Sequence, residues 1–202
     1  MKRLEISVFL SVVFYMFIGM FALNTQCDGI RDSVLRMHVL ANSDSSADQE
    51  LKMKVRDRLL EISSDIYSDA SSKEEAIMKT KKNLDLIRDE AKVVIESNGY
   101  TYPVSVSLEE TYFTTRSYDD FTLPAGNYQA LRVVIGEGKG HNWWCVMFPP
   151  LCISAASENE AQLSDILNSE QLELVEGNDY EIKFKCVEIY EELKKYLSEN
   201  HQ

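Results

Sequence analysis

Two cysteines on either side of a proline pair are the residues of this chain best placed to do chemistry. Cys145 lies inside the run Asn142-Trp143-Trp144-Cys145-Val146-Met147-Phe148, and Cys152 follows the turn Pro149-Pro150-Leu151. Two prolines forbid a helix, and a residue before proline favours an extended backbone. The pattern therefore predicts a strand from Trp143 to Phe148 that ends in a rigid turn, and that turn could bring Cys145 and Cys152 together.

A metal site and a nucleophile can both be drawn from the same residues, but the spacing argues against each. The candidate zinc ligands are His141, Cys145, Cys152 and Cys186, and the pattern His-x3-Cys-x6-Cys on a strand and turn matches no common structural zinc site. A Cys145 nucleophile would need the imidazole of His141 or His38 within hydrogen-bond reach. Along a strand, His141 and Cys145 lie roughly 13 Å apart. We therefore predict no metal, no cofactor and no catalytic residue.

The two tryptophans lie next to each other, so they point to opposite faces of the predicted strand. One of them should belong to the core, and the other should lie under a helix or be exposed. An exposed tryptophan beside a rigid apolar turn is typical of an anchor for a protein partner. We predict a partner-binding projection from the following residues: Trp143, Trp144, Phe148, Pro149, Pro150 and Leu151.

A second candidate contact is the polar run Asn42-Ser43-Asp44-Ser45, which follows an apolar, β-branched segment. Side chains of these types commonly cap helices and close turns, which would make the run structural. The functional alternative is an exposed contact at the carboxyl end of a strand, in which Asn42 and Asp44 would meet a partner.

The amino terminus is predicted to be an export segment. Lys2 and Arg3 precede Ile6–Leu23, which has no charged residue. As a helix this run spans about 27 Å, against about 30 Å for a hydrocarbon core, so residues 1–26 are predicted to be a signal peptide or a membrane anchor. The positive charges of Lys2 and Arg3 place the amino terminus inside the cell and all residues after Leu23 outside the cytoplasm. Cysteines oxidise there, which favours a Cys145–Cys152 disulfide, whereas the alternative is that each is a separately buried thiol.

Composition narrows the partners and the number of domains. The formal net charge is −12, spread along the chain, and nucleic-acid binding needs clustered Lys and Arg instead. Residues 27–202 have the length of one exported domain with a real core.

Hydrophobic periodicity predicts an α+β fold with a mixed or antiparallel sheet packed against two long helices and a closing helix. A β-hairpin is predicted in the carboxyl-terminal half, because five turn residues, 136–140, separate two strands. Cys186 is expected to be a buried thiol in the closing helix. The predicted strands are 34–40, 104–109, 128–135 and 143–148, and the predicted helices are 51–66, 72–95, a weaker 158–167 and 184–197.

Two blocks of residues carry a resemblance to a known family. The first block is Leu35-Arg36-Met37-His38-Val39-Leu40-Ala41-Asn42-Ser43-Asp44-Ser45, with Asp48-Gln49, Leu51-Lys52 and Val55-Arg56-Asp57. The second is Leu123-Pro124-Ala125-Gly126-Asn127-Tyr128-Gln129-Ala130-Leu131, Ile135-Gly136, Gly138, Gly140, Asn142-Trp143-Trp144-Cys145-Val146 and Phe148-Pro149-Pro150-Leu151-Cys152. With these blocks, residues 1–152 resemble stage II sporulation protein R of endospore-forming bacteria.

The resemblance implies a signalling protein rather than an enzyme. Members of this family are made in the forespore and exported into the space between the two membranes that separate it from the mother cell. There they activate a membrane-embedded aspartic protease, which removes the inhibitory segment of the mother-cell pro-sigma factor, pro-sigma-E. The family supplies no catalytic residue to transfer. An exported enzyme such as a cell-wall hydrolase is the alternative function.

Overall fold

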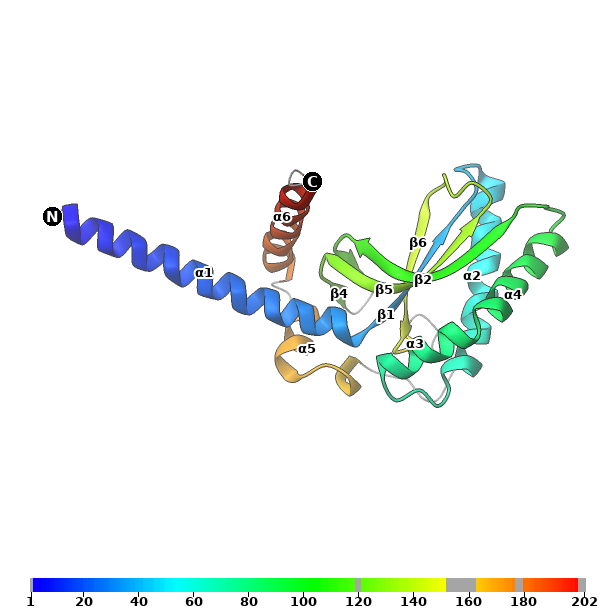
Figure 1. The fold of residues 1–202 in the computed structure, drawn as a ribbon, viewed down its shortest axis with the longest axis horizontal. Helices are drawn as coiled ribbons and strands as arrows, with labels where there is room; N and C mark the ends of the chain where they lie inside the picture. The colour runs from blue at the N-terminus through cyan, green and yellow to red at the C-terminus, as the bar shows by residue number, and fades with distance from the viewer. Residues whose placement is uncertain (1, 119–120, 152–162, 177–179, 200–202) are drawn as a thin grey trace. The chain divides into compact units, whose positions relative to one another are not determined.

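The chain divides into two compact units, each built from separate stretches of sequence. The computed structural model describes residues 2–118, 121–151, 163–176 and 180–199 (Figure 1). The sheet unit comprises residues 33–111 and 127–166, and the anchor unit comprises residues 1–32, 112–126 and 167–202.

The sheet unit is built on a mixed four-stranded sheet, which confirms the predicted α+β class. Its strands are β1 (Leu35–Leu40), β2 (Val104–Phe113), β5 (Gly126–Ile135) and β6 (Asn142–Phe148). They lie in the order β2-β5-β1-β6. Strand β1 runs parallel to β5, with Arg36 opposite Ala130, and antiparallel to β6, with Met37 opposite Cys145.

The predicted hairpin between β5 and β6 is wrong, because β1 lies between these two strands. Residues 136–141 therefore cross over the end of β1 and do not close a two-stranded turn. Alternating side chains show that a strand is half-buried but do not identify its neighbour. Here a strand from a distant part of the sequence takes the central place.

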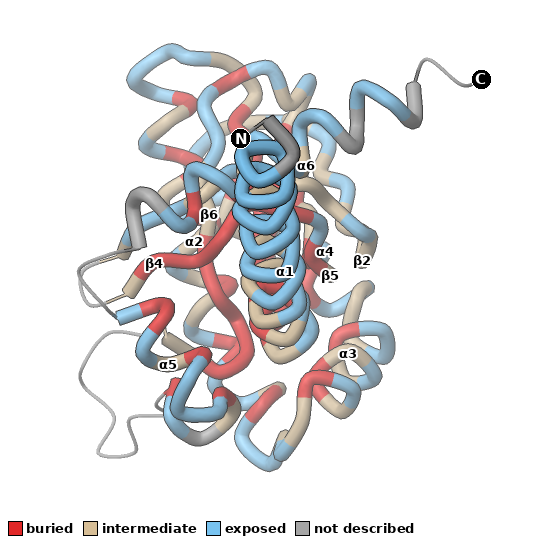
Figure 2. The backbone as a smooth tube through the Cα atoms, turned by 90° about the vertical axis from the view of Figure 1, so that its left-hand side faces the viewer, coloured by how far each residue is buried: buried red, intermediate tan, exposed pale blue. Residues whose placement is uncertain are grey.

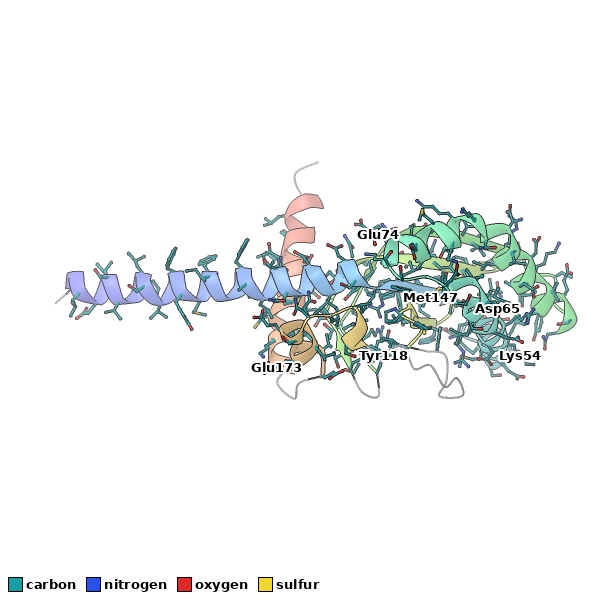
Figure 3. All side chains as sticks on the ribbon, turned by 90° about the horizontal axis from the view of Figure 1, so that it is seen from below. Lys54, Asp65, Glu74, Tyr118, Met147 and Glu173 are labelled. Carbon is teal, nitrogen blue, oxygen red and sulfur yellow. The ribbon has the colours of Figure 1, made fainter. Side chains whose placement is uncertain are left out.

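Two helices cover one face of the sheet: α2 (Ser46–Tyr67) and α4 (Leu84–Ser97). Side chains alternate along a strand, so Leu35, Met37 and Val39 share one face of β1 and join the helix-covered core. Met147 of β6 belongs to the same core (Figure 3). The helices contribute Leu51, Val55, Leu59, Ile87, Ala91 and Ile95.

The predicted helix over residues 72–95 is two helices, α3 (Lys73–Lys82) and α4, which meet at Asn83. Ser72 caps α3, since its hydroxyl accepts the Glu75 N–H at 3.3 Å. The Asn83 side chain donates to the Lys79 carbonyl at 2.8 Å, and the Asn83 carbonyl accepts the Ile87 N–H at 2.9 Å. Asparagine thus closes one helix and opens the next.

The anchor unit begins with α1 (Lys2–Ser33), which continues well past the predicted run of residues 6–23. Residues Leu4–Ser33 are long and apolar enough to cross a membrane, judged by length and composition. The amino-terminal half of this helix is exposed, whereas Cys27 and Ile30 are buried (Figure 2). The helix therefore combines an apolar segment that fits a signal or anchor with a carboxyl-terminal part that belongs to the folded unit.

The rest of the anchor unit consists of α5 (Ser169–Glu176), α6 (Tyr180–Glu199) and a small ladder of β3 (Arg116–Ser117) with β4 (Thr122–Leu123). A 3-10 turn, η1 (Leu163–Asp165), lies in the sheet unit at the end of the predicted helix 158–167, of which residues 158–162 lie outside the described part. Cys186 is exposed, so the prediction of a buried thiol there is wrong.

Arg31 holds the anchor unit together from inside. Its side chain is 6% exposed, and its guanidinium donates to the Ala125 carbonyl at 3.0 Å. It also pairs with Asp28 at 2.6 Å and with Glu191 of α6 at 3.4 Å. A Cβ at residue 126 would lie 2.2 Å from the Arg31 Nε, and the φ of that residue is +143°, so only Gly126 fits beside the buried cation.

Truncation of a core side chain of α4 should destabilise the sheet unit. Ile95 is fully buried, so Ile95→Ala should lower the free energy of unfolding by about 2–5 kcal/mol through lost burial and a residual cavity. Val93 on the same helix is 59% exposed, and Val93→Ala should change it by no more than about 0.5 kcal/mol. Urea unfolding of the full chain, followed by tryptophan emission, measures this because both tryptophans lie in β6. Equal effects of the two substitutions would contradict the packing described.

Candidate functional site

The two blocks of sequence that carry the family resemblance meet at one edge of the sheet. Parallel β1 and β5 end at this edge and β6 begins there, so the loop after β1 lies against the loop between β5 and β6. The Gly140 N–H donates to the Ala41 carbonyl at 2.9 Å, and the Lys139 N–H donates to the Asn42 carbonyl at 3.2 Å. We call residues 41–48 with residues 136–141 the loop cluster.

Asp48 is the centre of the loop cluster. Its carboxylate accepts the Ser43 hydroxyl at 2.5 Å and the Asn42 amide at 2.9 Å. Its own N–H donates to the Ser45 hydroxyl at 3.2 Å, which caps α2. The pKa of Asp48 is lowered below its ordinary value, and the hydrogen bond from Ser43 is the largest cause. The hydrogen bond from Asn42 lowers it further. A nearly buried carboxylate is thus kept ionised by donors from the neighbouring loop.

Two glycines allow the loops to approach this closely. The Asn42 side-chain oxygen accepts the Glu137 N–H at 3.0 Å, and a Cβ at Gly136 would lie 2.2 Å from that oxygen. Gly136 also has a φ of +59°, which favours glycine. A Cβ at Gly140 would lie 2.2 Å from the Ser43 carbonyl oxygen. The predicted structural role of the Asn42–Ser45 run is confirmed by these contacts.

The outer rim of the loop cluster is formed by Asp44 and His141. The Asp44 carboxylate accepts the His141 N–H at 2.5 Å and also contacts the His141 ring nitrogen Nδ1. The backbone hydrogen bond is the first cause of the lowered pKa of Asp44, and the ring contact is the second. The side chains are 56% and 79% exposed respectively, so this pair faces solvent. Beneath it, the Lys52 ammonium donates to the His141 carbonyl at 2.9 Å.

The two tryptophans lie on opposite faces of β6, as predicted, and both are half-buried. Trp143 packs against the helix-covered core, and the Arg56 guanidinium lies 4.9 Å from its ring centroid. Trp144 lies on the other face and stacks on His38 of β1, with ring centroids 3.8 Å apart. Neither tryptophan is the exposed anchor that the sequence left open.

His38 belongs to a row of side chains that crosses the face of the sheet without helices. It lies opposite Trp144 of β6 and opposite Arg132 of β5, and Arg132 pairs with Glu109 of β2 at 3.6 Å. Burial is the main cause that lowers the pKa of His38 to about 4. His38 is therefore neutral at physiological pH.

The predicted Phe148–Leu151 projection is wrong for its first two residues. Phe148 is opposite Leu35 in β1 and belongs to the core, and Pro149 is also buried. Pro150 and Leu151 are half-buried. The apolar side chain of Phe148 suggested a docking tip, but it packs inside the fold. Phe148 is the last residue of β6 and lies under the helices. Cys152 lies outside the described residues, so its disulfide with Cys145 stays a prediction.

The alternative chemistries find little geometric support. Cys145 is buried and faces the helix-covered core, whereas His141 lies on the exposed rim and His38 has the orientation of Trp144. The Cys145–His141 and Cys145–His38 pairs are therefore not brought together. Among the described residues, no three His, Cys, Asp or Glu side chains are grouped so that they could hold a metal ion. Sequence reasoning missed the role of Asp48, although its position three residues after Ser45 is a capping signal.

Replacement of Asp48 by asparagine should destabilise the loop cluster. Asp48→Asn removes the charge that accepts hydrogen bonds from Ser43 and Asn42, and the expected loss is roughly 1–3 kcal/mol at neutral pH. Because the folded pKa of Asp48 is lowered, its contribution exists above the unfolded pKa of about 4 and is lost as the pH falls further. Urea unfolding at a series of pH values measures the difference between the variant and the natural protein.

Glu50→Gln is the matched control, because Glu50 lies two residues further along the same helix but is well exposed and pairs with Lys54 on the helix surface. Its free energy of unfolding should change much less. A difference between Asp48→Asn and the natural protein that persists unchanged at acid pH would contradict the proposed role of the carboxylate.

Acid should destabilise the sheet unit through His38 as well. The unfolded state binds a proton near pH 6.5, whereas folded His38 does so only near pH 4. Stability should therefore decrease as the pH falls from about 6.5 to about 4, by on the order of 3 kcal/mol. His38→Gln should remove this part of the pH dependence. Imidazole NMR signals provide a direct test, and a His38 signal that titrates near pH 6.5 in the folded protein would exclude the effect.

Comparisons with known proteins point to one family. The family model described as "Stage II sporulation protein R (spore_II_R)" matches residues 31–158, which include the whole loop cluster. A protein named "Stage II sporulation protein R" from Bacillus subtilis (strain 168) is 39% identical over 132 residues, which are 65% of this chain and 59% of that protein. The chain thus spans less than two thirds of the length of this relative. No solved structure matches the chain. The matched region covers more than half of the sequence and unites both blocks in one site, and the chain belongs to the stage II sporulation protein R family.

Proposed function

We propose that this protein is an exported sporulation signal that activates a membrane-embedded aspartic protease, which then processes pro-sigma-E in the mother cell. Membership of the stage II sporulation protein R family is the observation that carries this proposal. The apolar helix α1 supports it, because a signal or anchor segment is what export from the forespore requires. The destination is the space between the two membranes.

The protease contact is proposed to lie on the rim of the loop cluster. Eight residues were candidates from sequence, and Asp44 is the most exposed of them. His141 is held beside it by two contacts, and the loops beneath are fixed by Asp48 and by close glycine approaches. A rigid polar rim limits the conformational entropy lost on binding. Pro150 and Leu151, half-buried at the end of β6, are kept as secondary contacts.

Activation needs more than binding. A ligand shifts a protease from an inactive to an active state only by the difference between its affinities for the two states. A shift from about 1% to about 99% active requires roughly 10⁴-fold preference for the active state. A rigid surface supports such a preference better than a flexible loop does. A loop that adapts to both the inactive and the active protease binds the two states with similar affinity.

Co-expression in a non-sporulating host tests the function. The full chain is produced together with the protease and pro-sigma-E, and processing of pro-sigma-E is followed by the size of the substrate on a gel. We expect processing with this protein and none without it. Processing at equal levels in both cases would overturn the proposal.

Variants of the rim test the contact surface in the same assay. Asp44→Arg combined with His141→Ala should reduce processing at least tenfold, because a charge is reversed and the paired ring is lost. Asp65→Arg on α2 is the control, since Asp65 is exposed in the same unit but lies outside the loop cluster (Figure 3). The amount of exported protein must be equal in all cases. Full processing by the rim variant would exclude the rim as the contact.

A further inference from the structure

Helix α6 has apolar residues on two opposite sides, and only one side is buried. Phe184 and Val187 are fully buried, and Glu191, one turn later, reaches the buried Arg31 of α1. Another set of large apolar residues in this helix is exposed, and we call it the outer face of α6: Ile189, Tyr190, Leu193, Tyr196 and Leu197. The exposed Cys186 lies at the start of this face.

The outer face lies opposite the buried one. Each residue turns a helix by about 100°, so Leu193 lies roughly 180° around the axis from Phe184, and the other outer residues lie within about 60° of Leu193. An apolar face of this width is typical of a helix packed against a surface. A large apolar face in water is costly, because the burial of apolar surface is the main favourable contribution to folding and association.

The position of α6 in the anchor unit indicates what covers this face. Helix α6 runs crosswise to α1, on the side of the unit from which the exposed half of α1 projects (Figures 1 and 2). That half of α1 is the segment suited to cross a membrane. If α1 crosses the membrane, a helix that lies crosswise to it, near the end of its apolar segment, runs along the membrane surface. The outer face of α6 is turned away from the core of the unit.

The distance along α1 agrees with this arrangement. Glu191 contacts Arg31, which is eight residues beyond the end of the apolar run at Leu23, or roughly 12 Å at helical rise. A helix with its side chains has a radius of about 5 Å, so an outer face turned toward the membrane lies roughly 7 Å from the hydrocarbon. The interfacial layer on each side of a bilayer is about 5–8 Å thick. The outer face therefore reaches the lipid headgroups.

We propose that α6 is an interfacial helix whose outer face inserts among the headgroups and upper acyl chains of the membrane that α1 crosses. Tyr190 and Tyr196 suit this depth, because tyrosine is enriched where a membrane meets water. Lys183 and Lys185 lie at the edges of the face, where long basic side chains can reach headgroups. The edges also carry Glu192, so insertion should depend on apolar contact more than on lipid charge. The anchor unit would then be held to the membrane at two places and kept in one orientation.

A fluorophore on Cys186 tests the proposal in the full chain reconstituted into phosphatidylcholine vesicles. Cys27 is buried, and Cys186→Ser, which should remove the label, verifies the labelled site. We expect emission at shorter wavelength than in water and strong quenching by lipids that carry a nitroxide near the headgroup, with weaker quenching by a nitroxide at mid-chain. Asp65→Cys with Cys186→Ser is the control for an exposed site in the sheet unit, and its emission should resemble that in water.

A variant of the outer face separates insertion from folding. Leu193→Glu leaves Phe184 and Val187 in place, and it should move the emission toward that in water and abolish lipid quenching while the helical circular dichroism is unchanged. Two results would overturn the proposal. In the first, the emission is at short wavelength, lipids do not quench it, and it moves toward that in water when the protein is diluted in lipid. This result would assign the face to a second copy of the chain. The same emission without dilution dependence would assign it to the sheet unit.

Discussion

Hydrogen bonding along both edges of β1 is the constraint on which the sheet unit depends. Because β1 pairs in parallel with β5 and antiparallel with β6, one edge of the sheet holds the end of β5, the end of β1 and the start of β6. The loops that leave these strands have to meet there. Ala41, Asn42 and Asp44 can bond to the 136–141 loop only because of this order. The same pairing gives β1 two different faces, one for the helix-covered core and one for His38 and Trp144.

The order of the strands is also what the sequence predicts least well. Periodicity located β1, β2, β5 and β6 and the helix α2, since these patterns are local. The partner of a strand is not local, because the alternation in β5 is the same beside β6 or beside β1. The loop cluster was missed for this reason: Asn42 and Asp48 are separated from Gly136 by nearly half of the chain. The capping role of the Asn42–Ser45 run could be read from the sequence, whereas the helix boundary at Asn83, in the middle of a periodic run, could not.

Helix α6 shows why burial was predicted less well than helicity. Phe184, Val187, Tyr190 and Leu193 recur every three residues, which looks like one stripe. A step of three turns a helix by about 300°, so three such steps carry the stripe from one side of the helix to the other. Phe184 and Val187 are thus buried, whereas Leu193 and the nearby Cys186 are exposed. A prediction that treated the stripe as one face could not separate the part that belongs to the core from the part that needs another partner.

The residues that carry the family resemblance divide into those that the fold requires and those that it does not. Gly136 and Gly140 permit a close approach, Asp48 collects the donors of the loop, and Phe148 fills the core; a substitution at any of these acts through folding. Asp44 and His141 bond to each other at the solvent boundary, above the buried Lys52, whose ammonium donates to the His141 carbonyl. Because both side chains are well exposed, a substitution there should cost less stability than one in the buried part of the loop cluster, and we propose this pair as a surface that another molecule contacts. The rim of the loop cluster therefore replaces the proline turn as the site where recognition should be sought.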